Sequence, residues 1–133
     1  MKKILVLCTG NSCRSQMLEA WLRHFSNGRF EVYSAGVEQH GINKDALYFM
    51  NEVGVDMSSQ TSDLIDIYLN TTFDLVVTVC DHARETCPVF PKSVKTIHRN
   101  FEDPSEANQE KKSTFIRVRD ELKEFALELI HFI

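Results

Sequence analysis

Two patterns of apolar and polar positions alternate along this chain of 133 residues. Short apolar runs bounded by polar or turn-forming residues predict buried strands, whereas apolar residues three or four positions apart predict helices. The predicted strands cover residues 3–7, 30–35, 73–79 and 94–98. The predicted helices cover residues 15–25, 45–53, 62–68 and 114–132, and the third of these is short. Strands that alternate with helices are typical of a parallel sheet covered on both faces.

No repeat, linker or low-complexity segment interrupts this alternation. An apolar content of 43% suits one hydrophobic core, because a chain of this size buries enough surface to fold as one unit. We therefore expect a single α/β domain over residues 1–133, with a four-stranded parallel sheet in the order 2-1-3-4 and helices on both faces. The polar stretch 102–113 is expected to be a mobile loop before the last helix.

The charge balance narrows the range of expected partners. The net charge is −4 and the isoelectric point is about 5.7, and no basic cluster stands out, so nucleic acid is not an expected partner. The apolar run at residues 4–7 is shorter than a signal-peptide core. No other stretch is long enough to cross a membrane. We expect a cytoplasmic monomer that binds neither nucleic acid nor membranes.

The candidate chemistry begins where the first predicted strand ends. The connection to the first predicted helix, hereafter the anion loop, consists of Cys8, Thr9, Gly10, Asn11, Ser12, Cys13, Arg14 and Ser15. The backbone N–H groups of such a loop, together with a helix N-terminus, form an anion-binding site. The planar Arg14 guanidinium matches two oxygens of a tetrahedral anion, and Gly10 is expected to adopt the unusual dihedrals of the loop. The anion loop therefore predicts binding of a phosphate-like oxyanion.

Cys8 is placed to attack the bound anion. The positive groups of the loop should lower the pKa of Cys8 and hold it as a thiolate nucleophile. A lone cysteine at a strand end is more often a small buried hydrophobe. The combination of Cys8, five residues and Arg14 between a strand and a helix nevertheless favours an active site. Asn11 and Ser15 are expected to hold the shape of the loop through side-chain hydrogen bonds.

The four cysteines also suggest a metal site or redox chemistry. In a cytoplasmic chain they should be reduced at rest. Zinc is one alternative, because Cys80, His82 and Cys87 cluster and Cys8 and Cys13 form a second pair. Neither cysteine pair has the two to four intervening residues of the usual zinc knuckle, so we do not favour zinc.

The predicted sheet brings distant residues to one edge. Cys8 follows the first strand, Cys80 follows the third, and Asp103 lies shortly after the fourth. Ligands of open parallel sheets bind beyond the carboxyl ends of the strands, where the strand order reverses. Neighbouring strands lie about 4.8 Å apart, and a disulfide joins Cα atoms roughly 4.4–6.8 Å apart. Cys8 and Cys80 are therefore expected within bridging reach.

These motifs resemble those of a known family, the thioredoxin-coupled arsenate reductases, which share the low-molecular-weight tyrosine phosphatase fold. The resemblance covers nearly the whole chain. Beyond the anion loop and Gln16, the matching segments are Val32-Tyr33-Ser34-Ala35-Gly36, Gln60-Thr61-Ser62-Asp63, Asp74-Leu75-Val76-Val77-Thr78-Val79-Cys80, Cys87-Pro88, Phe101-Glu102-Asp103-Pro104 and Arg117-Val118-Arg119-Asp120-Glu121. Cys80 and Cys87 distinguish a reductase from a phosphatase, because phosphatases of this fold do not need that pair.

The resemblance implies a three-cysteine relay that reduces arsenate to arsenite. Cys8 attacks arsenate, and Asp103 matches the general acid that protonates the departing oxygen. Cys80 then attacks the sulfur of Cys8 and arsenite leaves. Cys87 next attacks Cys80, and thioredoxin reduces the resulting disulfide. Phosphate or sulfate would act as substrate analogues, and Cys13 takes no part in the relay. The sequence alone leaves open that Asp103 is only a turn former before Pro104.

Some members of the family bind potassium beside the anion loop. Asn11, Glu19, Ser34 and Asp63 match those ligand positions, and oxygen donors suit a hard cation. Otherwise the protein is expected to have no tightly bound cofactor. The alternative is that Glu19 is a solvated helix charge and Asp63 a helix cap.

The chain also departs from the family. Arg99 and Asn100 stand where the family often has Trp-Gly, so the loop that carries Asp103 could close differently. The helix formers at residues 81–86 predict a helical turn in the reduced protein that unwinds when the Cys80–Cys87 disulfide forms.

Two other functions remain open. A low-molecular-weight tyrosine phosphatase would carry aromatic residues after Asp-Pro, whereas Ser105 and Glu106 stand there. Weak phosphatase activity is still expected from the anion loop. The third alternative is a non-catalytic, redox-sensing, anion-binding module.

Overall fold

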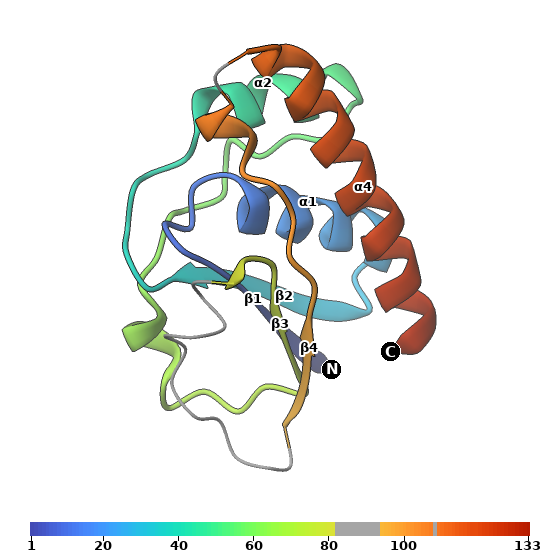
Figure 1. Cartoon of the computed structure of the whole chain (residues 1–133). Helices are drawn as coiled ribbons and strands as arrows, with labels where there is room; N and C mark the ends of the chain where they lie inside the picture. The colour runs from blue at the N-terminus through green and yellow to red at the C-terminus, as the bar shows by residue number, and fades with distance from the viewer. Residues whose placement is uncertain (82–93, 108) are drawn as a thin grey trace.

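The fold is a four-stranded, all-parallel sheet with helices packed against it (Figure 1). The computed structural model describes residues 1–81, 94–107 and 109–133. The strands are β1 (Lys2–Cys8), β2 (Phe30–Gly36), β3 (Leu75–Thr78) and β4 (Lys95–His98). Their order is β2-β1-β3-β4, and every neighbouring pair is parallel. The predicted fold class and strand order are confirmed.

The burial of each strand follows its place in the sheet. β1 lies between two neighbours, and its apolar run Ile4-Leu5-Val6-Leu7 is almost fully buried. A strand covered on both faces reads as a continuous apolar run, which is why the pattern predicted β1 so closely. β4 is an edge strand, and its Lys95 and Thr96 are exposed.

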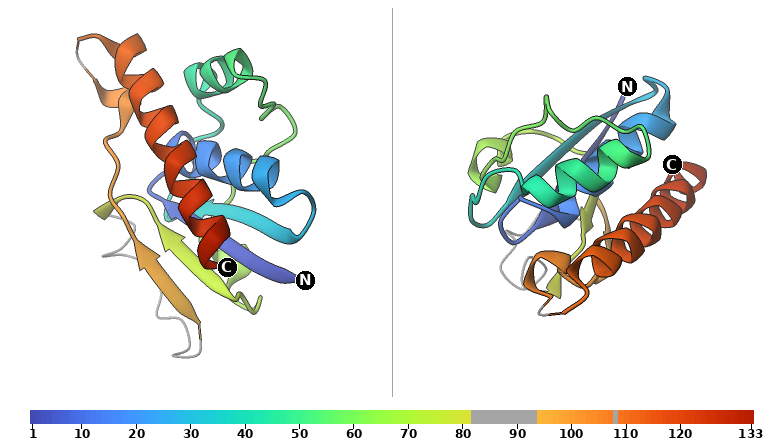
Figure 2. Two further views of the ribbon diagram at one scale, coloured as in Figure 1. Left: turned by 90° about the vertical axis from the view of Figure 1, so that its right-hand side faces the viewer. Right: turned by 90° about the horizontal axis from the view of Figure 1, so that it is seen from above.

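In the described residues, three α-helices lie on one side of the sheet. They are α1 (Arg14–Ser26), α2 (Lys44–Glu52) and α4 (Lys111–Phe132). Figures 1 and 2 show α1 and α4 side by side over the strands, with α2 against both of them. Phe115, Leu122 and Phe125 form the buried stripe of α4. This apolar face anchors α4 on the helix that begins at the anion loop.

The opposite face carries η1 (Ile65–Tyr68), a 3-10 helix at the position of the short predicted helix. Ser34 of β2 points to α1, where its hydroxyl donates to Glu19. Tyr33, the preceding residue, therefore faces the other side, because side chains alternate along a strand. Its ring lies 5.4 Å from that of Tyr68 in η1. Both faces of the sheet are thus covered, as predicted.

The structure corrects the expected loop at residues 102–113. Pro104–Glu106 form a 3-10 helix, η2, and α4 begins at Lys111. The polar composition of this stretch concealed both elements, because the first turn of α4 is exposed and carries no apolar periodicity. The helical turn predicted at residues 81–86 falls almost wholly in 82–93, outside the described residues.

Candidate active site

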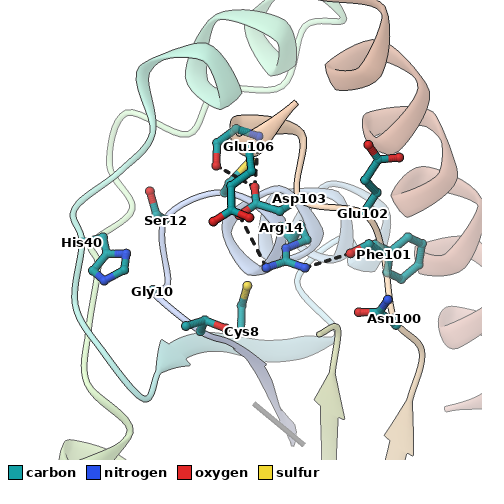
Figure 3. Close-up of a pocket in the computed structure, with 13 residues that line it drawn as sticks. Cys8, Gly10, Ser12, Arg14, His40, Asn100, Phe101, Glu102, Asp103 and Glu106 are labelled. Atoms are coloured by element: carbon teal, nitrogen blue, oxygen red, sulfur yellow. Dashed lines mark hydrogen bonds and ion pairs between the residues drawn. The ribbon is translucent and has the colours of Figure 1, made fainter. Parts of the chain in front are cut away.

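The carboxyl ends of the strands open into a cavity of about 420 Å³ beside the anion loop. Figure 3 shows Cys8 at its floor with Arg14 above, His40 on one side and Asn100 on the other. The segment around η2 completes the wall with three acidic side chains, those of Glu102, Asp103 and Glu106. The structure therefore brings together residues from the ends of three strands, as the predicted topology requires.

Asn11 holds the anion loop in shape. It is fully buried and has a φ of 49°, in the left-handed region that asparagine tolerates better than most residues. Its Nδ2 donates to the hydroxyls of Ser15 and Ser34, each at 2.9 Å. Its Oδ1 accepts from the backbone N–H of Asp63 at 2.7 Å. The expected role of Asn11 in shaping the loop is confirmed, and Ser15 accepts one of its bonds.

Gly10 has a different role from the one predicted. The positive φ of the loop belongs to Asn11, and Gly10 is not among the residues in that region. The ring of His40 lies directly over Gly10, so that a Cβ built there would stand 2.3 Å from Nδ1 of His40. The backbone N–H of His40 also donates to the Gly10 carbonyl at 3.0 Å. Glycine is required here for the close approach of His40.

Arg14 lines the cavity from the first turn of α1. Its Nη1 donates to the Phe101 carbonyl at 2.8 Å, which orients the guanidinium. Arg14 is 9% exposed, and its buried Nε–H has no hydrogen-bond partner. The helix is capped by no side chain and has no acidic residue in its first turn. A buried donor without a partner is costly, so this arrangement fits an anion that accepts from Arg14 and from the helix N-terminus.

Cys8 lies at the floor of the cavity, and Cys80, which does not line the cavity, is the hydrogen-bond partner of the Cys8 side chain. Both cysteines are buried, and Sγ of Cys80 is also 3.2 Å from Oγ1 of Thr9. The hydrogen bond with Cys80 and burial raise the pKa of Cys8 well above its ordinary value. Arg14 and the backbone N–H of Ser15 act in the opposite direction but do not prevail. The expected depression of the pKa of Cys8 is therefore wrong for this arrangement of the two thiols.

Asp103 contacts both η2 and the arginine of the cavity. Its Oδ1 caps η2 by accepting from the Ser105 backbone N–H at 3.0 Å and from the Ser105 hydroxyl at 2.7 Å. Its Oδ2 lies 3.7 Å from Nη2 of Arg14. One oxygen is thus a turn former, and the other faces the cavity.

Cys13 is the third described thiol of the site. It is 5% exposed, precedes α1 and lines the cavity. Burial, with the nearby Asp103 and Asp45 carboxylates, raises the pKa of Cys13 despite the opposing charge of Arg14. Cys13 is therefore a neutral thiol at physiological pH.

The four predicted potassium ligands lie together, with Asn11, Glu19 and Ser34 buried and Asp63 half-buried. The Ser34 hydroxyl donates to Glu19 Oε1 at 2.5 Å and accepts from Asn11. Burial raises the pKa of Glu19, and the charge of Asp63 acts in the same direction. The carboxylates of Glu19 and Asp63 and the Ser34 hydroxyl suit a hard cation. Asn11 fits less well, because its Oδ1 is directed to the backbone of Asp63.

The residues that depart from the family have defined contacts. The Arg99 guanidinium lies 4.4 Å from the centroid of the Phe125 ring and pairs with Glu128 at 3.0 Å, which ties the segment before Asp103 to α4. Asn100 lines the cavity and accepts from the backbone N–H of Asp81 at 3.3 Å.

Other predictions fall partly outside the described residues. Cys87 and His82 lie within 82–93. Within the described part of the chain, no group of three or more His, Cys, Asp or Glu side chains is arranged to hold a metal ion such as zinc. Likewise, none of the described helices has the length and apolar character needed to span a membrane.

Sequence reasoning missed His40. Its position after the second predicted strand places it at the same sheet edge as Cys8, and this was the available signal. Nε2 of His40 lies 3.0 Å from Oε1 of Glu38, at the rim of the cavity.

This fold and site define a class of protein. The sequence model of the low molecular weight phosphotyrosine protein phosphatase family matches residues 3–133, and the chain belongs to that family. Within it, the chain is 51% identical to the arsenate reductase of Bacillus subtilis (strain 168), over 94% of this chain and 95% of that protein. A solved arsenate reductase in the phosphate binding state is 32% identical, with a TM-score of 0.84 and coverage of 100% of this chain and 99% of that chain. A solved arsenate reductase in the oxidized state is also 32% identical, with a TM-score of 0.86 and coverage of 98% of both chains.

Proposed function

We propose that this protein reduces arsenate to arsenite through a relay of Cys8, Cys80 and Cys87. The observation that carries the proposal is the contact between the thiols of Cys8 and Cys80 beneath the buried, partly unpartnered guanidinium of Arg14. Reduction of arsenate needs two electrons, and two adjacent thiols that become a disulfide supply them. Relatives named arsenate reductase support the same assignment.

The first step forms a sulfur–arsenic bond. Arsenate occupies the cavity with its oxygens on Arg14 and the backbone N–H groups of the anion loop. The Cys8 thiolate attacks arsenic, and one arsenate oxygen leaves as water after accepting a proton from Asp103. Because the pKa of Cys8 is raised while Cys80 is its hydrogen-bond partner, the thiolate forms as that contact loosens.

The second step transfers the electrons. The Cys80 thiol gives its proton to an oxygen of the departing group, and its sulfur attacks Sγ of Cys8. A sulfur–sulfur bond forms, the sulfur–arsenic bond breaks, and its electron pair stays on arsenic. Arsenic passes from the +5 to the +3 state and arsenite leaves, while two thiols are oxidised to the Cys8–Cys80 disulfide.

The third step regenerates the site. Cys87 attacks the sulfur of Cys80, Cys8 is released as a thiol, and the disulfide passes to Cys80 and Cys87. Thioredoxin, a dithiol protein, then reduces this pair, which completes the cycle with no tightly bound cofactor. We place the reaction in the cytoplasm, where thioredoxin maintains reduced thiols, and expect the protein to act as a monomer.

A phosphatase is the second candidate, favoured by the anion loop alone. A phosphorylated tyrosine would have to pass a rim that carries Glu102, Ser105 and Glu106. The two carboxylates repel an anionic peptide, and none of the three side chains offers an aromatic face to its ring. Hydrolysis of small phosphate esters is therefore expected only as a weak side activity. A redox-sensing module without turnover is the third candidate.

We further propose that potassium binds between buried Glu19 and Ser34 and half-buried Asp63. Two carboxylates there are balanced in part by Arg23, whose Nη2 lies 2.5 Å from Oε2 of Glu19. A hard cation would complete the neutralisation and so stabilise the loop segment that Asn11 joins to this network.

The test is NADPH oxidation in the presence of thioredoxin, thioredoxin reductase and arsenate. Wild-type protein should consume NADPH in proportion to the arsenate supplied, and replacement of arsenate by phosphate should abolish consumption. Cys8→Ser should abolish both arsenate reduction and ester hydrolysis. Cys80→Ser should abolish reduction but retain slow hydrolysis of p-nitrophenyl phosphate. Ester hydrolysis without any arsenate-dependent oxidation would favour the phosphatase, and the absence of both activities would favour the sensor.

A further inference from the structure

A chain of side-chain hydrogen bonds holds the residue that follows Cys80. Thr78, at the end of β3, is buried, and its Oγ1 lies 2.7 Å from Nδ1 of His98 at the end of β4. Nε2 of His98 lies 2.9 Å from Oδ1 of Asp81. The backbone N–H of Asp81 donates to Oδ1 of Asn100 at 3.3 Å. We call Asp81, His98 and Asn100 the Asp81 clamp.

One tautomer of His98 satisfies both hydrogen bonds of its ring, to Thr78 and to Asp81. A neutral imidazole has one donor and one acceptor nitrogen, whereas a carboxylate only accepts. Nε2–H therefore donates to Asp81, and Nδ1 accepts from the Thr78 hydroxyl. Because Thr78 is buried in the sheet, it fixes the imidazole orientation from the core side, and the imidazole in turn fixes Asp81.

The clamp completes the fixation of Cys80. On the preceding side, the Val79 N–H donates to the Leu7 carbonyl and the Phe101 N–H donates to the Val79 carbonyl, both at 3.0 Å. These backbone bonds follow from the sheet and would form with many sequences. On the following side, the chain is held by the side chains of the clamp. Cys80 lies between these two fixed points, in contact with Cys8 and Thr9.

We propose that the Asp81 clamp positions Cys80 for the second step of the relay, an inference that rests on the function proposed above. In that step the sulfur of Cys80 attacks Sγ of Cys8, the sulfur–arsenic bond breaks, and the proton of Cys80 leaves with arsenite. Displacement at sulfur needs the attacking atom in line with the breaking bond, and a shift of about 1 Å can slow such a step about a hundredfold. Asp81, His98 and Asn100 are positioning residues, since they act through the backbone that carries Cys80.

Stability and positioning can be separated at Asp81. Its side chain is 66% exposed, so its contact with His98 contributes little to the stability of the fold. Asp81→Ala removes the acceptor. Asp81→Asn is the matched control, because the amide Oδ1 can still accept from Nε2–H of His98. His98→Phe removes the same bond from the other side.

The experiment isolates the second step with Cys87→Ser protein, in which the relay stops at the Cys8–Cys80 disulfide. Reduced protein is mixed with arsenate without oxygen, quenched with acid and alkylated, and the disulfide is followed by mass spectrometry over time. Asp81→Ala should lower the limiting rate at saturating arsenate about tenfold or more. The arsenate concentration that gives half the limiting rate should not change. Asp81→Asn should stay within about twofold of the parent, since the bond is kept.

The outcomes separate this inference from the proposed function. If the Cys87→Ser parent forms no disulfide with arsenate, the relay itself is wrong and the inference fails with it. If the parent reacts but Asp81→Ala and His98→Phe react as fast or faster, only the clamp is refuted. Equal slowing by Asp81→Ala and Asp81→Asn would also refute it, because only the first loses the bond. The melting temperature of Asp81→Ala should lie within about 2 °C of the parent, and slowing that merely tracked a larger fall would indicate a structural role.

Discussion

The two carboxylate oxygens of Asp103 make different contacts: Oδ1 caps η2, and Oδ2 lies 3.7 Å from Nη2 of Arg14. The cap fixes the side chain where the segment after β4 passes over the cavity. The second oxygen consequently stays at the cavity wall, near the position where an oxygen of a bound anion would lie. The turn-forming role is therefore compatible with the acid role proposed for Asp103.

Replacement of this carboxylate should separate the two tasks. Asp103→Asn keeps an oxygen that can cap η2 but cannot donate an acidic proton, so arsenate turnover should fall about 10²- to 10⁴-fold with the fold intact. Asp103→Ala loses the cap as well and should also lower the melting temperature. Steady-state NADPH oxidation and thermal unfolding measure the two effects. Glu106→Gln, on the same cavity wall, is the control and should retain turnover within a few-fold. Full activity of Asp103→Asn would exclude the acid role.

The sequence pattern predicted the sheet well because the strands that position the site are buried. β1 is covered on both faces, so its apolar run has a single interpretation, and the turn residues of the anion loop mark its end. Parallel pairing then requires the carboxyl ends of β1, β3 and β4 to share one edge, which brings Cys8, Cys80 and Asp103 together without any knowledge of side-chain contacts.

What the pattern could not predict depends on contacts across the fold. The place of His40 over Gly10 depends on a loop that returns to the cavity, and no local pattern encodes that return. The raised pKa of Cys8 depends on the sulfur of Cys80, 72 positions away in the chain. The prediction of a lowered pKa considered only the positive groups of the anion loop. Exposed helical turns, such as the start of α4, lack the apolar periodicity on which the prediction relied.

The contact between Gly10 and His40 can be tested by a pair of substitutions. Gly10→Ala places a Cβ against the imidazole, where the ideal position is 2.3 Å from Nδ1, so the ring must move away. Because the His40 side chain is 54% exposed and can turn aside, we expect a cost of about 1 kcal/mol. In His40→Ala protein the space is free, and the same substitution should cost less than about 0.5 kcal/mol. Urea unfolding of the four proteins gives the coupling, and equal costs in both backgrounds would contradict the packing.

Potassium should stabilise the protein through the Glu19 network. At a potassium concentration ten times its dissociation constant, binding linkage adds about 1.4 kcal/mol to the free energy of unfolding. For a chain of this size that raises the melting temperature by roughly 5 °C. Sodium at the same ionic strength is the reference, and Glu19→Gln should remove the difference between the two salts. Identical melting curves in sodium and potassium for the wild type would show that no specific site exists.

The buried thiol of Cys13 should make the protein sensitive to alkaline pH. In the folded state its pKa is raised, chiefly by burial, whereas an unfolded cysteine ionises near pH 8.5. Above that pH only the unfolded state loses the proton, so the free energy of unfolding falls by about 1.4 kcal/mol per pH unit for this group. Cys13→Ala should show a shallower decline between about pH 8.5 and 11. Parallel stability curves of the two proteins, measured with reductant by urea unfolding, would refute this assignment.

The contact between the thiols of Cys80 and Cys8 should keep Cys8 protonated. Since the hydrogen bond with Cys80 is the largest cause of the raised pKa of Cys8, Cys80→Ala should lower that pKa. Arg14 and the Ser15 N–H would then act against burial alone. Removal of Cys80 therefore favours the Cys8 thiolate and should increase the reactivity of Cys8 at neutral pH.

The rate of Cys8 alkylation by iodoacetamide, followed by mass spectrometry across a pH series, reports the fraction of thiolate. The midpoint for Cys80→Ala should lie at lower pH than the wild-type midpoint. Cys87→Ala is the control for loss of a relay cysteine and should leave the midpoint close to the wild-type value. Saturating phosphate should slow alkylation in all three proteins, because the anion covers Cys8. An unchanged or higher midpoint in Cys80→Ala would mean that burial, and not the second thiol, sets the protonation of Cys8. In that case arsenate binding would not need to separate the two sulfurs before the first step.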